Sequence, residues 1–474
     1  MDSNSVLDIF KEITTIPRES GHEGPMTQWL KEWADRRGLA WSEDAAHNIL
    51  ITREAAPGKE DVPAIALQAH QDMVCEKNGD SFHDFLHDPI NYVIRDGWMI
   101  AEDTTLGADD GIGIAACLSL LEDSAPTGKV ECLFTISEET GMDGAFALEK
   151  GFFDAKTLIN LDSEDEGQLF IGCAGGIHTD ATFKISREPV RSGWETLSLA
   201  IRGGIGGHSG DDINKGRANT LHELVRFLYS EMPLGMQILS LGGGGKSNAI
   251  AREACAVVAV PSAERTAGRF EAFGKALSFE FHVTDPGLEC VSESVSATSL
   301  AFDADSAAKI VTSLFACPHG VWAMSQDIEG LVETSTNLAA VRTLPDDTVY
   351  VSTSQRSSIT SQRDMIAAKV EAAFALSGAQ ISHNNPYPGW APDVNSHILK
   401  VCVESYRKLF GQSPEVKAIH AGLECGLFLE KFPDLDMISF GPTLRGVHAP
   451  GERLELASLD KFVELLKDVV CNFK

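Results

Sequence analysis

The stretch AIALQAHQDMV at residues 64–74 decides how this chain folds. Its first six residues, 64–69, are apolar apart from Gln68 and have the length of a buried strand, and the polar residues His70 and Asp72 follow directly. Side chains two positions apart in an extended chain lie on the same face. Because ligands gather beyond the carboxyl ends of strands in open α/β sheets, the stretch predicts a buried strand that ends at a candidate site containing His70 and Asp72.

The segments around this strand alternate between helical and strand-like patterns. Apolar residues recur at helical spacing in some segments, and others are short apolar runs of strand length. This alternation favours the α/β class, with a mainly parallel sheet and helices on both of its faces. The predicted helices lie at 5–16, 26–33 and 112–121, and the predicted strands at 48–52, 130–136 and 157–161.

The pattern changes near residue 187 and returns near the C-terminal end. The intervening chain is richer in glycine and serine, and the stretch HNNPYPGWAPD at 383–393 is typical of a linker. A helix at 396–409 and a strand at 436–440 then restore the opening pattern. We therefore expect one α/β domain made of residues 1–188 and 389–474, interrupted by an inserted α+β domain at 189–388.

Composition limits the classes of partner and compartment. The 474 residues include 39 Lys+Arg and 69 Asp+Glu, a net charge of −30, which argues against nucleic acid and anionic membranes as partners. The apolar runs are shorter than the roughly 20 residues that cross a bilayer, and the N-terminal residues lack the pattern of a secretory signal. Ten scattered cysteines without a CxxC motif favour reduced thiols in a cytoplasm.

Further polar residues lie where predicted elements begin or end. A helix cap would require only one of two adjacent aspartates, adjacent glutamates are usually solvated, and a lone loop histidine is usually inert. Each group alone is therefore a weak signal. The residues are Asp109 and Asp110 at the start of a helix, Glu138 and Glu139 after one strand, Asp162 after the next, and His448 in a loop beyond the last strand.

Taken together, these residues indicate a metal site. His70, Asp109, Glu139, Asp162 and His448 form a mixed imidazole–carboxylate set, which suits zinc, manganese or cobalt better than calcium. Five ligands exceed the needs of a single zinc ion. A shared carboxylate would support two metals about 3.5–4 Å apart, as in aminopeptidases and other hydrolases.

Eight motifs follow one another along the chain: LQAHQDMV (67–74), TTLGADDGIGIA (104–115), SEETGMDGAF (137–146), LINLDSEDEG (158–167), GCAGG (172–176), GGHSG (206–210), PYPGW (386–390) and HAGLECGLF (420–428). In this order they resemble the M20 metallopeptidases, in particular the bacterial aminoacyl-histidine (Xaa-His) dipeptidases. The resemblance covers nearly the whole chain. It implies an enzyme that hydrolyses unblocked dipeptides, of the Xaa-His type or more broadly, with two divalent ions that are zinc, cobalt or manganese.

The resemblance also implies a division of the metal ligands between two ions. One ion would be held by His70 and Asp162 and the other by Glu139 and His448, with Asp109 bridging them.

Three further residues carry implied catalytic roles. Asp72 would orient His70, as carboxylates behind ligating histidines do. Glu138 would be the general base that takes a proton from metal-bridged water and passes it to the leaving amine. The inserted domain would be the family's lid, with His208 helping to stabilise the oxyanion.

The resemblance also implies residues that contact the substrate. Arg356 matches the lid arginine that holds a terminal carboxylate, with Arg342 as the competing choice. Asn337 or Asn248 supplies the lid asparagine. Glu424 is placed to meet a free substrate amine or is an ordinary loop carboxylate.

Other functions fit the sequence less well. The glycine run at 242–245 with Lys246 resembles a phosphate-binding loop, but position 240 is Ser where the motif requires Gly, and strand-like residues follow. An M20 aminoacylase, carboxypeptidase or tripeptidase would use the same metals and base. A dead metal- or peptide-binding protein would have lost Asp72 or Glu138, and both are present. A dipeptide is the expected partner, and a homodimer is compatible with the sequence.

Overall fold

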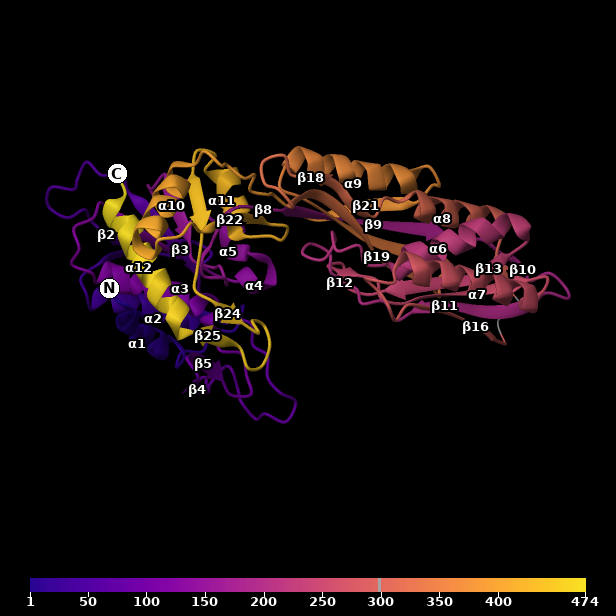
Figure 1. The fold of residues 1–474 in the computed structure, drawn as a ribbon, viewed down its shortest axis with the longest axis horizontal. Helices are drawn as coiled ribbons and strands as arrows, with labels where there is room; N and C mark the ends of the chain where they lie inside the picture. Colours follow the sequence, from indigo (N-terminus) through magenta and orange to yellow (C-terminus); the bar gives the residue numbers. More distant parts are fainter. Residues whose placement is uncertain (297–299) are drawn as a thin grey trace. The chain divides into compact units, whose positions relative to one another are not determined.

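The computed structural model describes residues 1–296 and 300–474, which divide into two compact units (Figure 1). Unit 1 comprises Met1–Gly172, Pro392–Ala418 and Leu423–Lys474, and unit 2 comprises Cys173–Ala391 and Ile419–Gly422. Unit 2 therefore begins before residue 189, where we expected the inserted domain to start. The reason is that strand β9 (Gly175–Lys184) pairs along its length with β20 (Thr348–Ser357) of unit 2.

Unit 1 is built on an eight-stranded mixed sheet in the order β1-β2-β6-β3-β7-β23-β8-β22. The central strands β6, β3, β7 and β23 run parallel, and the pairs β1–β2, β2–β6 and β23–β8 are antiparallel. All residues of β3, β6 and β7 are buried, so both faces of the sheet are covered, as the α/β prediction requires. The strands are β1 (Ala40–Glu43), β2 (Ile49–Arg53), β3 (Ile65–His70), β6 (Val130–Thr135), β7 (Thr157–Asn160), β8 (Gln168–Cys173), β22 (Glu415–Ile419) and β23 (Asp436–Ser439).

Helices and a small four-stranded sheet complete unit 1. Helix α3 packs against α1 and β3 and buries nearly all of its residues, which explains its apolar sequence. The small sheet has the order β24-β25-β5-β4. The bounds are α1 (Ser3–Ile13), α2 (Gly24–Asp35), α3 (Ala108–Leu121), α4 (Glu138–Gly141), α5 (Asp143–Ala147), α10 (His397–Phe410), α11 (Glu424–Lys431), α12 (Leu456–Asn472), β4 (Tyr92–Arg95), β5 (Trp98–Ala101), β24 (Leu444–Arg445) and β25 (Arg453–Glu455).

Unit 2 is an antiparallel sheet with helices packed on it. The strand order is β16-β11-β15-β13-β19-β20-β9-β21, and β18 also pairs with β19. Leu224, Phe270, Ile310 and Phe374, one from each of four helices, join a single hydrophobic core with the sheet. The longer elements are α6 (Thr220–Glu231), α7 (Ala263–Glu280), α8 (Ala304–Ala316), α9 (Thr360–Ala375), β11 (Glu195–Arg202), β13 (Gln237–Gly244), β15 (Ala254–Val260), β16 (Glu289–Ser294), β18 (Gly320–Met324), β19 (Val332–Leu344) and β21 (Gln380–Tyr387). The shorter ones are β10 (Arg187–Pro189), β12 (Gly207–His208), β14 (Ala249–Ile250), β17 (Leu300–Phe302) and the 3-10 helix Met232–Leu234.

Two sequence expectations change in unit 2. The first half of the predicted linker at 383–393 is part of β21, because its backbone pairs with β9, for example His383 with Thr179. The glycine run from 242 ends strand β13, which pairs with β19, so no helix begins there to hold a phosphate. In the described part of the chain, no helix combines the length and apolar character needed to span a membrane.

Candidate metal centre

The candidate site of unit 1 lies where the parallel strands end. His70 is the last residue of β3, Glu138 begins the short helix α4 after β6, and Asp162 follows β7. Strand β3 pairs in parallel with both β6 and β7. The carboxyl ends of the three strands therefore meet at one edge of the sheet, which brings together residues far apart in sequence.

Asp109 lies between two histidines. Its Oδ1 is 2.9 Å from Nε2 of His70, and its Oδ2 is 3.1 Å from Nε2 of His448. Asp162 Oδ1 lies 3.6 Å from the same nitrogen of His70, and Glu139 Oε2 lies 3.0 Å from that of His448. The two oxygens of Asp109 thus face two different groups of candidate ligands.

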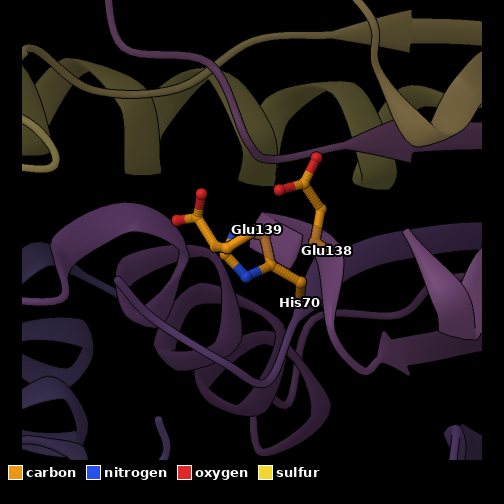
Figure 2. Close-up of side chains that lie close together, drawn as sticks. All are labelled: His70, Glu138 and Glu139. Atoms are coloured by element: carbon orange, nitrogen blue, oxygen red, sulfur yellow. The ribbon is translucent and has the colours of Figure 1, made fainter. Parts of the chain in front are cut away.

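Three groups of candidate ligands have one donor atom per residue within 4.8 Å of the others. They are His70 with Asp109 and Asp162, Asp109 with Glu139 and His448, and His70 with Glu138 and Glu139. Figure 2 shows the carboxylates of Glu138 and Glu139 extending in different directions from neighbouring positions, near the His70 ring. Two neighbouring glutamates can therefore serve different purposes.

Asp72 connects the His70 strand to the helix that carries the glutamates. One carboxylate oxygen lies 3.3 Å from Nδ1 of His70 and accepts the backbone N–H of Glu138 at 3.0 Å. The other accepts the backbone N–H of Glu139 at 3.2 Å and the hydroxyl of Ser20 at 2.8 Å. Burial raises and the His70 imidazole lowers the pKa of Asp72, and the balance holds it at about 2.

The site concentrates negative charge. Burial raises the pKa of Glu138 well above its usual value, and the charges of Glu424 and Glu139 add to the effect. Burial and the charge of Asp109 likewise raise the pKa of Asp162. The carboxylates of Asp109 and Glu139 raise the pKa of His448 to about 11. Such crowding is what a bound cation would relieve.

The donor set fits a divalent transition metal. Two imidazoles and three carboxylates offer both nitrogen and oxygen donors, and Asp109 is shared between two of the groups. With a cation bound, its charge would replace the protons that crowded carboxylates otherwise retain. The types of donor atom therefore fit zinc, manganese or cobalt. The number and the identity of the ions stay predictions.

The predicted histidine and asparagines of the inserted segment lie in unit 2. His208 is in β12, and its Nδ1 accepts the backbone N–H groups of Gly210 and Asp211, both at 3.3 Å. Asn337 is buried, and its amide donates to the carbonyl of Ala249 at 2.9 Å. Asn248 is exposed next to the β14 strand that pairs with His208. Asn337 therefore anchors the β14 segment, and Asn248 is the asparagine whose side chain is accessible.

The two candidate arginines differ in their surroundings. Arg356 is partly buried, donates to the Tyr387 hydroxyl at 3.1 Å, and has a buried Nε without a hydrogen-bond partner in the described structure. Arg342 is exposed and pairs across the sheet with Gly242. Which of the two arginines holds a carboxylate stays a prediction.

Glu424 lies in unit 1 at the start of α11 and is fully buried. Its Oε2 accepts from Nε2 of Gln68 at 2.6 Å and from the hydroxyl of Thr135 at 2.9 Å, while Oε1 has no hydrogen-bond partner among the described residues. Burial raises the pKa of Glu424 to about 7. Because the side chain has no exposed surface, its predicted contact with a substrate amine stays a prediction.

Two residues of the site gave no signal in the sequence. Glu452 accepts backbone N–H groups from the loop before Asp109, and Arg18 donates to carbonyls of the same loop and of the His70 segment. Glu452 stands four positions after His448, but that spacing alone does not indicate a contact with a loop more than 300 residues earlier. Only the folded chain brings these residues together.

Comparison with known proteins places the chain in a family. The sequence profile of Peptidase family M20/M25/M40 matches residues 66–472. The cytosol non-specific dipeptidase of Escherichia coli is 39% identical over 470 residues, covering 98% of this chain and 97% of that one. The structure of aminoacylhistidine dipeptidase from Vibrio alginolyticus matches with a TM-score of 0.94 at 38% identity, covering 99% of this chain and 96% of that chain. Aminopeptidase PepT from Bacillus cereus, at 18% identity over 99% of this chain and 98% of that one, shares the fold with a TM-score of 0.58. The chain therefore belongs to Peptidase family M20/M25/M40.

Proposed function

We propose that this peptidase is a metal-dependent dipeptidase that acts on unblocked dipeptides. The observation that carries the proposal is the position of Asp109, whose two oxygens face His70 on one side and His448 on the other. One ion would be held by His70 and Asp162 and a second by Glu139 and His448, with Asp109 shared. The dipeptidases of Escherichia coli and Vibrio alginolyticus, similar over nearly their whole length, support the choice of substrate class.

In this proposal the protein's own side chains move the proton. Bound ions would supply polarisation of the scissile carbonyl and a lower pKa for the attacking water. Glu138 takes the proton from that water and delivers it to the leaving amine. The raised pKa of Glu138 makes it a stronger proton acceptor, and the leaving amine, which is more basic than a carboxylate, takes the proton from it. Asp72 keeps His70 in the orientation that a ligand needs.

The roles of the unit 2 residues are part of the proposal. Arg356, which is partly exposed, would hold the terminal carboxylate of the substrate through its guanidinium, and Asn248, the accessible asparagine, would contact the substrate. His208 would donate to the oxyanion through Nε2, since its Nδ1 already accepts two backbone N–H groups. A cytoplasmic location and a homodimer stay predictions of the sequence.

A substrate panel tests the proposal. Purified protein is incubated with free dipeptides including Xaa-His and β-alanyl-histidine, their N-acetylated forms, and tripeptides, each with and without chelator. Free dipeptides should be cleaved fastest, and the chelator should abolish cleavage until divalent metal is added back. Preference for acetylated substrates would favour an aminoacylase, preference for tripeptides would favour a tripeptidase, and no turnover of any substrate would favour a binding protein.

A further inference from the structure

Two loops that carry candidate ligands come together in the small sheet of unit 1. The His448 loop connects β24 to β25, and β25 pairs with β5, with Arg453 opposite Ile100. The chain after β5 leads into the loop before Asp109. The two loops are therefore attached to the same small sheet, but that pairing ends before either ligand is reached.

Glu452 joins the two loops beyond the sheet. Its Oε2 accepts the backbone N–H of Leu106 at 2.7 Å and that of Gly107 at 3.0 Å. Its Oε1 accepts the backbone N–H of Ala108 at 2.8 Å and that of Asp109 at 3.4 Å. The side chain is 2% exposed. All four of these partners are donors, so the contacts suit the ionised carboxylate, which also lies at the N-terminal end of helix α3 where a negative charge is favourable.

Arg18 holds the same loop from its carbonyl side. Its guanidinium donates to the backbone carbonyls of Asp72 at 2.7 Å and Gln71 at 3.1 Å, directly after His70, and also to the carbonyl of Gly107. Burial lowers the pKa of Arg18, and the charge of Glu452 is the largest influence that opposes it. The backbone N–H of Gly107 thus donates to Glu452, and its carbonyl accepts from Arg18.

The glycines around Arg18 leave room for its guanidinium. A Cβ at Gly107 would lie 2.5 Å from Nη2 of Arg18, and one at Gly111 would lie 2.6 Å from the same atom. Gly107 also has a φ of +69°, which favours glycine. The local sequence of the Asp109 loop is therefore adapted to a buried arginine that lies outside residues 66–472, the part matched by the family profile.

We propose that Arg18 and Glu452 are positioning residues that set the distance between the two halves of the metal centre. Glu452 ties the His448 loop to the Asp109 loop, and Arg18 ties the Asp109 loop to the end of the His70 strand. Neither side chain is a ligand. Because a bridging carboxylate must present each oxygen to a different ion, displacement of the Asp109 backbone weakens binding at both. This inference rests on the proposed metal centre but not on its substrate.

Zinc affinity of the metal-free protein tests the role of Glu452. The substitution Glu452→Gln keeps the shape but turns one acceptor oxygen into an NH₂ group that faces backbone N–H donors. We expect zinc to bind about 10–100-fold more weakly, as measured by competition with a chromophoric chelator. The absorption spectrum of bound Co²⁺ should also change, because the ligand geometry changes.

Glu131→Gln is the matched control. Glu131 is also buried in unit 1 and accepts backbone N–H groups, from Asp154 at 3.0 Å and Ala155 at 2.8 Å, but it lies near the opposite end of β6 from Glu138. Both variants should lose stability to urea, and only Glu452→Gln should lose zinc affinity. The proposal would be overturned if Glu452→Gln bound zinc as tightly as Glu131→Gln and neither variant changed the Co²⁺ spectrum.

A second variant decides the question if Glu452→Gln does not fold. Arg18→Lys keeps the charge but loses the forked guanidinium that reaches three carbonyls. Weaker zinc binding by this variant supports the proposal, and wild-type affinity overturns it. Because zinc binding is measured without peptide, failure of the dipeptide assay with intact wild-type zinc binding would count against the proposed substrate and not against this inference.

Discussion

Glu138 is the residue on which the proposed chemistry depends. Substitution Glu138→Gln removes the base and keeps the side-chain volume, so turnover of a free dipeptide should fall by about 10²–10⁴-fold. Bound metal should stay nearly unchanged, because all five proposed ligand residues remain. Steady-state kinetics and metal analysis of the same sample check both expectations. Loss of metal together with activity would show that Glu138 is a ligand and not the base.

Glu424 predicts a pH dependence of stability. Its folded pKa of about 7 lies above the usual 4.5, so between these values the folded protein keeps a proton that the unfolded chain has released. Stability from this group is therefore lost as pH rises from about 4.5 to about 7. This loss is on the order of 3 kcal/mol of unfolding free energy. The substitution Glu424→Gln keeps an acceptor for Gln68 and Thr135 and removes the pH-dependent loss.

Urea unfolding of the metal-free proteins at several pH values measures this effect. The stability of Glu424→Gln relative to wild type should increase from pH 4.5 to pH 7. Exposed Glu60, whose pKa is lowered by backbone hydrogen bonds, is the control, because Glu60→Gln should give a constant difference across the same window. A flat difference for Glu424→Gln would mean that the buried carboxyl is ionised throughout.

At the scale of elements, the loop that leads into α3 depends on the close approach of the Gly107 backbone to the side chains of Arg18 and Met73. In Gly107→Ala the new Cβ would lie 2.5 Å from Nη2 of Arg18 and 2.7 Å from Sδ of Met73, at a φ of +69°. Strain and overpacking together should cost about 2–5 kcal/mol of unfolding free energy. Gly97→Ala has a similar φ of +80° with nothing within 4 Å, so it should cost only about 1–2 kcal/mol. Equal losses in urea unfolding would contradict the close contact.

The sequence was most informative about the secondary-structure elements. The predicted strands at 64–69, 130–136 and 157–161 are β3, β6 and β7, and the helix at 112–121 lies within α3. These segments are strongly apolar because they are covered on both faces, which is the pattern a sequence displays best. The stretch 383–387 lies in β21 and not in a linker: its proline and two asparagines carry little strand signal, and its pairing with β9 is non-local.

At the scale of the whole molecule, metal should determine the stability of unit 1. Two ions would offset the mutual repulsion of the crowded carboxylates, so removal by chelator should lower the melting temperature. Adding zinc at 100 times its dissociation constant should restore about 2.7 kcal/mol per site. Scanning calorimetry with zinc and, separately, the same concentration of calcium distinguishes site binding from screening of the net charge of −30. Equal effects of the two ions would argue against a specific centre.

The α/β class, the strands that end at the site and the candidate ligands can be predicted from the sequence alone, because local hydrophobic patterns and the polar residues that follow them encode each of these. Three features become visible only in the folded chain: Asp109 faces both histidines, Arg18 and Glu452 hold its loop, and β9 belongs to unit 2. These features depend on contacts between segments up to hundreds of residues apart. Buried charges and backbone hydrogen bonds across such distances leave no periodic trace in a single sequence.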